Sequence, residues 1–278
     1  MSSRSLSQQA LTARYSDAPA IQADPEGAAL LQSMICRGSC RAFLPDPVPA
    51  PLVDLLCATA LASPTKSDLQ QRDIIVLRCT SQRAQLAKLV GGQAWVADAP
   101  MLAVFCGNNR RQRLLHAWHD IPFANDHIDA MFNAAGDAAI ALGAFVTAAE
   151  AVGLGCCPIS AVRNEARAVS DLLRLPDHVF PFAGLALGYP SQDPEIAKRL
   201  PLQVTCHTDH YREDGVQAAV EGYDRNRARA QPYAKQRFPE TFPDKPLYGW
   251  SEDKARQYSA PERADFGAYL RAQGFTLK

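Results

Sequence analysis

The segment from Asp126 to Val152 reads DHIDAMFNAAGDAAIALGAFVTAAEAV and is the longest helical candidate in the chain. Apolar or small residues occupy almost every position, with alanine at many of them. A helix that is apolar nearly all round must be enclosed by protein on most sides, so this segment predicts a central core helix. Its small residues also let another helix approach closely, which makes it a candidate for part of a dimer interface. Gly153-Leu-Gly155 then predicts a glycine stop.

The sequence around this helix predicts an alternation of helices and short strands. Apolar runs predict strands at 73–79, 101–106 and 180–190, with 156–162 as a strand or turn. Helical spacing predicts helices at 25–35, 52–63, 82–90, 108–118 and 165–173, a long helix from about 212, and one closing helix at 252–273. The polar residues 1–25 predict a flexible arm. Residues 26–278 then form a single domain, with 212–250 as a mobile excursion and 251–278 as a C-terminal extension.

Composition limits the classes of function. Lys plus Arg equals Asp plus Glu at 29 each among 278 residues, so no net charge attracts nucleic acid or an anionic membrane. No apolar run approaches the roughly 20 residues that cross a bilayer, and the first residues do not resemble a secretory signal. We therefore expect a cytoplasmic protein. The eight cysteines are scattered without a C-x-x-C pair, which favours buried, reduced thiols over disulfides or zinc.

A compact cluster of hydrogen-bond donors lies at Arg37-Gly-Ser39-Cys-Arg41. Two guanidinium groups, a hydroxyl and several backbone N–H groups favour an anion, and a phosphate suits them best. The alternative is that both arginines lie on a solvated helix end. The cluster alone does not decide between these.

Further motifs follow the arginine cluster in order along the chain. They are Ala62-Ser-Pro-Thr-Lys-Ser67-Asp-Leu-Gln70, Gly153-Leu-Gly155, Val162-Arg-Asn, Leu173-Arg-Leu-Pro-Asp-His, Leu185-Ala-Leu-Gly-Tyr-Pro, Lys198-Arg-Leu-Pro201, His207-x-x-x-Tyr211 and the tail from Trp250 to Phe275. Together with Arg37-x-Ser39-x-Arg41-x-Phe43 they resemble the FMN-dependent nitroreductase family, and within it the branch of NADPH-dependent nitroreductases and flavin reductases. The resemblance covers residues 34–275.

This resemblance implies an α+β fold in which helices surround a mainly antiparallel sheet. It also implies an intertwined homodimer with FMN at the subunit interface. The implied activity is hydride transfer from NADPH, with NADH as the alternative donor, through flavin N5 to nitroaromatic, quinone or flavin acceptors by a ping-pong mechanism. FMN carries the chemistry, so no catalytic side chain is expected. The alternative is a flavin-binding or flavin-storing protein with little turnover.

The resemblance also assigns the flavin contacts, in four groups along the chain. They are Arg37, Gly38, Ser39 and Arg41 for the phosphate and ribityl chain; Pro64, Thr65, Ser67, Asp68 and Gln70 for the ring edge and ribityl chain; Pro158, Ile159, Ser160 and Ala161 for backbone donors near N5 and O4; and Lys198 and Arg199 for the phosphate.

The chain departs from the family pattern at three places. Asp68 stands where many members carry Asn, so it is expected to pair with Lys66 or Arg72, or to be a simple loop carboxylate. Ser160-Ala161 stands where the branch often has two glycines, which adds bulk above the ring. The branch commonly has Lys-Pro-Arg-Leu-Pro, whereas this chain has Ala-Lys-Arg-Leu-Pro, so Lys198 is displaced by one residue.

A basic stretch formed by Arg225, Arg227, Arg229, Lys235 and Arg237 coincides with the mobile cofactor loop of the NADPH-using branch. Arg229, Lys235 and Arg237 are its candidates for the NADPH phosphate, although a solvated basic surface explains them equally well. His116 and His119 share a helical face near acidic residues, but they match no zinc signature, so no metal site is predicted.

Overall fold

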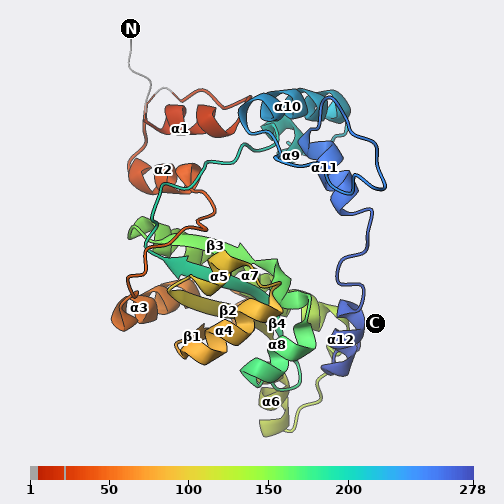
Figure 1. Ribbon diagram of the computed structural model, residues 1–278. Helices are drawn as coiled ribbons and strands as arrows, with labels where there is room; N and C mark the ends of the chain where they lie inside the picture. The colour runs from red at the N-terminus through yellow and green to blue at the C-terminus, as the bar shows by residue number, and fades with distance from the viewer. Residues whose placement is uncertain (1–5, 22) are drawn as a thin grey trace. The chain divides into compact units, whose positions relative to one another are not determined.

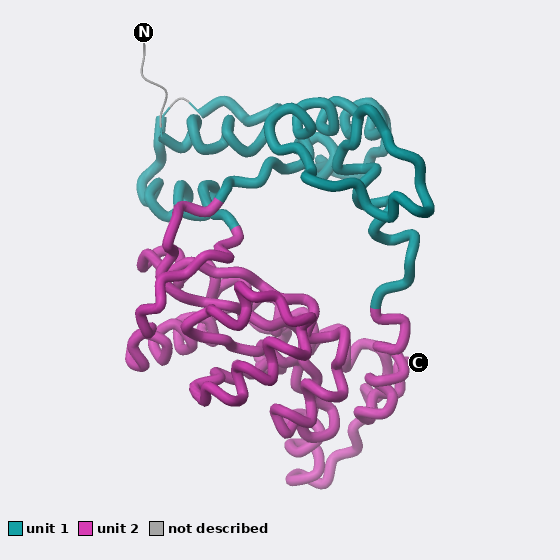
Figure 2. The backbone as a smooth tube through the Cα atoms, in the orientation of Figure 1, with its two compact units in different colours: residues 1–38, 195–262 teal, residues 39–194, 263–278 magenta. Residues whose placement is uncertain are grey.

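The computed structural model describes residues 6–21 and 23–278, which divide into two compact units (Figure 2). Unit 1 contains Met1–Gly38 and Glu195–Glu262, and unit 2 contains Ser39–Pro194 and Arg263–Lys278. The described N-terminal residues up to Gly38 thus belong to the same unit as the 195–262 segment.

Unit 2 is built on an antiparallel sheet that has four strands in the described part of the chain, in the order β1-β2-β4-β3 (Figure 1). The strands are β1 (Arg72–Leu77), β2 (Met101–Asn108), β3 (Gly155–Ile159) and β4 (Val179–Gly188). The helices of the unit are α3 (Ala50–Leu61), η1 (Lys66–Asp68), α4 (Thr80–Leu89), α5 (Ala94–Ala97), α6 (Arg110–Trp118), α7 (Ile128–Ala151), η2 (Ser160–Arg163), α8 (Ala166–Leu173) and α12 (Phe266–Ala272). The α+β class and the antiparallel sheet are confirmed.

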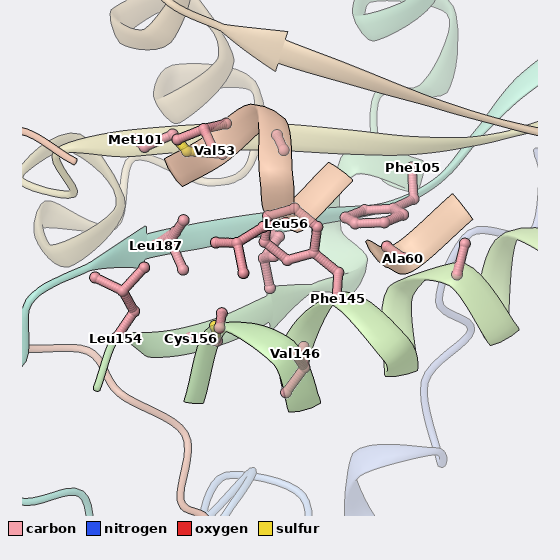
Figure 3. Close-up of a cluster of buried hydrophobic side chains, with 14 residues drawn as sticks. Val53, Leu56, Ala60, Met101, Phe105, Phe145, Val146, Leu154, Cys156 and Leu187 are labelled. Atoms are coloured by element: carbon pink, nitrogen blue, oxygen red, sulfur yellow. The ribbon is translucent and has the colours of Figure 1, made fainter. Parts of the chain in front are cut away.

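Strand β2 separates two hydrophobic cores because its side chains alternate between the faces of the sheet. Met101, Ala103 and Phe105 pack with α3 and α7 in one core, whereas Leu102, Val104 and Cys106 pack with α4 and α8 in the other. Figure 3 shows the first core, where the Phe105 ring meets the Phe145 ring edge-on with centroids 5.6 Å apart. Every residue of β2 is buried, as expected for a strand covered on both faces.

Helix α7 is the predicted central helix, with 24 residues. Within the described residues it is the one helix long and apolar enough to cross a membrane by length and composition, so the expectation that no segment approaches that length is wrong. Eight of its residues are buried, and they pack against α3 and the sheet. The enclosure is incomplete, however, because the apolar side chains of Ile128, Phe132 and Ile140 are exposed along one face.

Unit 1 is helical in the residues that the structure describes. Its helices are α1 (Leu6–Arg14), α2 (Ala28–Cys36), α9 (Leu202–Thr205), α10 (Val216–Ala230) and α11 (Trp250–Gln257). Helix α1 lies in the segment that was expected to have little structure, and it packs on α2. The Asp24 carboxylate caps the N-terminus of α1 by accepting hydrogen bonds from the backbone N–H groups of Leu6 and Ser7, both at 3.1 Å. Its buried residues, Ser7, Ala10 and Arg14, are mostly polar, which hides the helical period.

The C-terminal segment also differs from expectation. One closing helix was predicted, but the structure has α11 in unit 1 and α12 in unit 2. Pro261 follows shortly after α11 and has no N–H group to continue a helix.

The eight cysteines all fall within the described residues, and all are free thiols. Cys40, Cys106, Cys156 and Cys157 are buried as predicted. Cys36, Cys79 and Cys206 are exposed, because they lie at or just beyond the ends of helices or strands rather than inside the cores.

Candidate functional site

The loop that precedes β1 is organised by one buried carboxylate, that of Asp137 on α7. This side chain accepts from the backbone N–H groups of Lys66 at 3.0 Å and Gln71 at 2.8 Å, and from the Thr65 hydroxyl. The Thr65 hydroxyl oxygen accepts in turn from the Gln70 N–H at 2.9 Å. Asp137 is 1% exposed, so these donors replace its hydration. An Asp in the interior of a long Ala-rich helix is the signal that could have identified it.

The same loop holds three residues in the left-handed region of backbone space. The φ angles are 47° at Ser67, 56° at Asp68 and 51° at Gln70, although none of them is glycine. Such conformations persist where the surrounding contacts impose them, and they gather at binding sites. All three side chains are exposed. The loop therefore presents a fixed set of hydroxyl, carboxylate and amide groups to solvent.

Asp68 does not pair with Lys66 or Arg72, as had been expected. Its Oδ1 accepts from the Gln70 side-chain amide at 3.1 Å, because both residues curl back on the same tight turn. The Arg72 guanidinium instead donates to the carbonyl groups of Leu61 at 2.7 Å and Ser63 at 2.8 Å. It also lies 3.7 Å from the Asp137 carboxylate. The Asp68 carboxylate is thus held by an amide and carries no cationic partner in these contacts.

Ser39 and Arg41 flank a residue that is fixed to the sheet. The Cys40 N–H donates to the Cys156 carbonyl at 2.9 Å, and the Cys40 side chain is 2% exposed. Gly155 makes this close approach possible, since a Cβ at that position would lie 2.6 Å from the Cys40 sulfur. With Cys40 turned inward, Ser39 and Arg41 are both exposed.

The segment 158–161 lies at the end of β3, where η2 begins. Ile159 is buried, whereas Pro158 and Ser160 are exposed and Ala161 is half-buried. The Arg263 guanidinium donates to the Ser160 hydroxyl at 3.3 Å and to the Asn164 side chain at 2.9 Å. Sequence reasoning missed Arg263, which lies about a hundred residues further along the chain.

Unit 1 contains the other flavin candidates, Arg37, Gly38, Lys198 and Arg199. The candidate site is therefore described as two groups of residues, one in each unit. In unit 1 a buried arginine of α1, Arg14, contacts both parts of its group: its guanidinium donates to the Arg37 carbonyl and to the Ala197 carbonyl, the latter at 3.1 Å. Burial, and then the charges of Arg199 and Arg37, lower the pKa of Arg14. Positive charge is therefore concentrated around Arg14 in unit 1.

A cavity of about 430 Å³ lies within unit 1 and combines cationic with aromatic side chains. Its lining includes Tyr15, Lys198, Arg199, Leu200, Tyr223, Arg227, Tyr233, Trp250 and Lys254. The Arg227 guanidinium stacks over the Tyr233 ring at 5.2 Å. Among the NADPH candidates, Arg229 and Lys235 are exposed, and Arg237 donates to the Asp253 carboxylate at 3.0 Å. Of the predicted basic stretch, the structure thus places Arg227 in the lining of this cavity, together with Lys254, whereas Arg229, Lys235 and Arg237 are not part of it.

Comparisons with known proteins agree over nearly the whole chain. Residues 36–189 match the model of the nitroreductase family, and residues 198–278 match the model of its C-terminal domain. The FMN reductase (NAD(P)H) of Bacillus subtilis is 29% identical over 252 residues, which are 90% of this chain and 98% of that protein. The oxygen-insensitive NADPH nitroreductase of Salmonella typhimurium is 34% identical over 173 residues, which are 62% of this chain and 70% of that protein.

The fold of this chain also matches that of a solved structure. The NADPH:FMN oxidoreductase of Vibrio harveyi, complexed with NAD+, superposes with a TM-score of 0.77 at 26% identity. The match covers 88% of this chain and 98% of that chain.

Proposed function

Because the chain belongs to the nitroreductase family, we propose that it is an FMN-dependent oxidoreductase that moves a hydride from NAD(P)H to nitroaromatic, quinone or flavin acceptors. The relatives named FMN reductase and NADPH nitroreductase support this activity. The structural observation that carries the proposal is the loop at 64–70. Its left-handed residues are fixed by the buried Asp137, so its polar side chains are positioned before any ligand arrives.

The donor groups of the chain fit FMN. A flavin phosphate needs cations, and in unit 1 the charges of Arg199 and Arg37 both act on Arg14. The pyrimidine edge of a flavin needs hydroxyl and amide partners, and unit 2 presents those of Ser67 and Gln70. When bound, FMN supplies the two-electron chemistry, since its ring can take a hydride from a reduced nicotinamide and give it to an acceptor.

The residues of the chain then bind and orient the cofactor. Within unit 1 we assign Arg37 and Arg199 to the phosphate. Within unit 2 the exposed side chains of Ser39 and Arg41 stay candidates for flavin contacts. The backbone at 158–161 would face the ring, where Arg263 fixes the Ser160 hydroxyl. A fixed hydroxyl at this position narrows the range of acceptors more than two glycines would.

The exposed apolar face of α7 supports a homodimer. Ile128, Phe132 and Ile140 are 44%, 68% and 43% exposed, and they lie along one side of the helix. Three large apolar side chains in a row favour burial against a second surface. We propose that this face pairs with a second copy of the chain, and that residues 26–278 act as one cytoplasmic FMN-binding domain in each copy.

For the nicotinamide nucleotide we propose NADPH in preference to NADH. The support is the basic character of the segment that contains Arg229, Lys235 and Arg237. The lining of the cavity in unit 1 adds two more cations: Arg227, which precedes this segment in the sequence, and Lys254, which follows it.

One experiment tests the function directly. The purified protein should be yellow, should bleach without oxygen when NADPH is added, and should recover its colour with a quinone or a nitroarene. Initial rates at several fixed acceptor concentrations should give parallel double-reciprocal lines, as a ping-pong mechanism requires. Yellow protein that does not bleach would support the flavin-storing alternative, and protein that cannot be loaded with FMN would contradict both.

A further inference from the structure

Arg14 is the last residue of α1, and its side chain connects three backbone segments of unit 1. Its Nε donates to the Ile35 carbonyl at 2.6 Å, and its terminal nitrogens donate to the carbonyl groups of Arg37 and Ala197. The Arg14 residue is 5% exposed. Helix α1 precedes the segments that match the family models, which begin at residue 36. The connection is thus a feature of this chain's N-terminal segment.

The end of α1 is also joined directly to the 198–199 segment. The Arg199 N–H donates to the Arg14 carbonyl at 3.0 Å, and the Lys198 ammonium lies 3.3 Å from the Ala13 carbonyl. A cation at a helix C-terminus is favourable because the last carbonyl groups are unpaired there. Lys198, displaced by one residue from the family pattern, is therefore used to hold α1.

The electrostatics of this cluster favour an anion. After burial, the positive charges of Arg199 and Arg37 lower the pKa of Arg14, so like charges act on a buried guanidinium. Burying a guanidinium next to two others is costly. A dianionic phosphate would relieve that cost, whereas a neutral ligand would not.

We propose that Arg14 is a positioning residue for the flavin phosphate: it holds the backbone of Arg37 and of residues 197–199 so that both cationic side chains serve one phosphate. This inference rests on the proposed FMN-dependent function. It assigns to α1 a part in cofactor binding that the shared domain does not contain.

The test compares two ligands that differ by the phosphate alone. Flavin-free protein is titrated with FMN and with riboflavin, and binding is followed by quenching of flavin fluorescence. In Arg14→Gln we expect the FMN dissociation constant to rise about 10-fold or more, as for loss of a charge-assisted contact. Riboflavin binding should change less than about 2-fold. Arg225→Gln, an exposed arginine on α10, is the matched control and should change neither constant.

The comparison separates positioning from a merely structural role. If FMN and riboflavin weaken equally in Arg14→Gln, or if neither weakens, the inference is overturned. If Arg14→Gln does not fold, Arg14→Lys decides the question, because lysine keeps the charge but cannot span three carbonyl groups. A raised FMN-to-riboflavin ratio of dissociation constants then supports the inference, and a ratio equal to the wild type overturns it. Wild-type protein that binds neither flavin would instead contradict the proposed function.

Discussion

Two buried charged residues organise the two groups of candidate contacts, and they do so in opposite ways. Asp137 holds the 64–70 loop of unit 2 by accepting from backbone N–H groups, whereas Arg14 holds unit 1 by donating to backbone carbonyl groups. Asp137 has Arg72 at 3.7 Å as a compensating charge, whereas burial and the nearby charges of Arg199 and Arg37 lower the pKa of Arg14. This difference supports the proposal that the charge of Asp137 is compensated within the chain, whereas the charge of the Arg14 cluster is compensated by an anionic ligand.

The largest expected effect on stability comes from removing the charge of Asp137. Asp137→Asn keeps the shape but loses the charge that faces Arg72 and two acceptor interactions, so we expect a loss of about 3 kcal/mol in the free energy of unfolding. Thermal or urea unfolding of the flavin-free protein measures it. FMN and riboflavin should weaken together, in contrast to Arg14→Gln.

Asp129→Asn is the matched control, since Asp129 lies on the same helix but is exposed and contacts the Asn133 side chain. It should change stability by less than about 0.5 kcal/mol. If Asp137→Asn changed stability as little as Asp129→Asn, the 64–70 loop would not depend on its buried carboxylate. The contrast drawn between Asp137 and Arg14 would then be wrong.

A smaller effect is expected where the 39–41 segment meets β3. Gly155→Ala would force a methyl group to within 2.6 Å of the buried Cys40 sulfur, so we expect a loss of about 2 kcal/mol in stability. Ser39 and Arg41 would shift with Cys40, and FMN should weaken more than riboflavin. Gly143→Ala is a suitable control because nothing lies within 4 Å of a Cβ at that position. Equal stability of the two variants would show that Cys40 can move away at little cost.

The smallest effect concerns the exposed cations of unit 1. The double substitution Arg229→Gln and Arg237→Gln should raise the KM for NADPH about 10-fold, which corresponds to about 1.4 kcal/mol, and should leave the KM for NADH nearly unchanged. Steady-state rates with both nucleotides measure this, and Arg271→Gln, an exposed arginine on α12 outside the basic stretch, serves as the control. An equal rise for NADH and NADPH would exclude a role in recognising the 2′-phosphate. The cavity residues Arg227 and Lys254 would then be the next positions to test.

The parts of the fold that sequence reasoning found are those with a repeated apolar pattern. Helix α7, the strands and the helices α3, α4 and α8 bury apolar faces, so periodicity located them. Helix α1 was missed because it buries a serine, an alanine and an arginine. The split between α11 and α12 was missed because a helical pattern was extended across Pro261.

The candidate site was predictable only where motifs are local in sequence. The clusters at 37–41 and 64–70 were located, but their anchors Asp137, Arg14 and Arg263 come from distant parts of the chain. The pairing of Asp68 with Gln70 depends on left-handed backbone angles, which could not be predicted because none of the residues involved is glycine. The residues assigned to FMN and NADPH therefore stay predictions until the titrations above are made.

The exposed apolar face of α7 has a thermodynamic consequence. The homodimer proposed above would cover Ile128, Phe132 and Ile140, and it would bind the folded chain and not the unfolded one. By mass action, such binding raises the apparent free energy of unfolding with the concentration of the chain itself. The melting temperature of this protein should therefore rise on concentration and fall on dilution, so a value has meaning only when the protein concentration is stated with it.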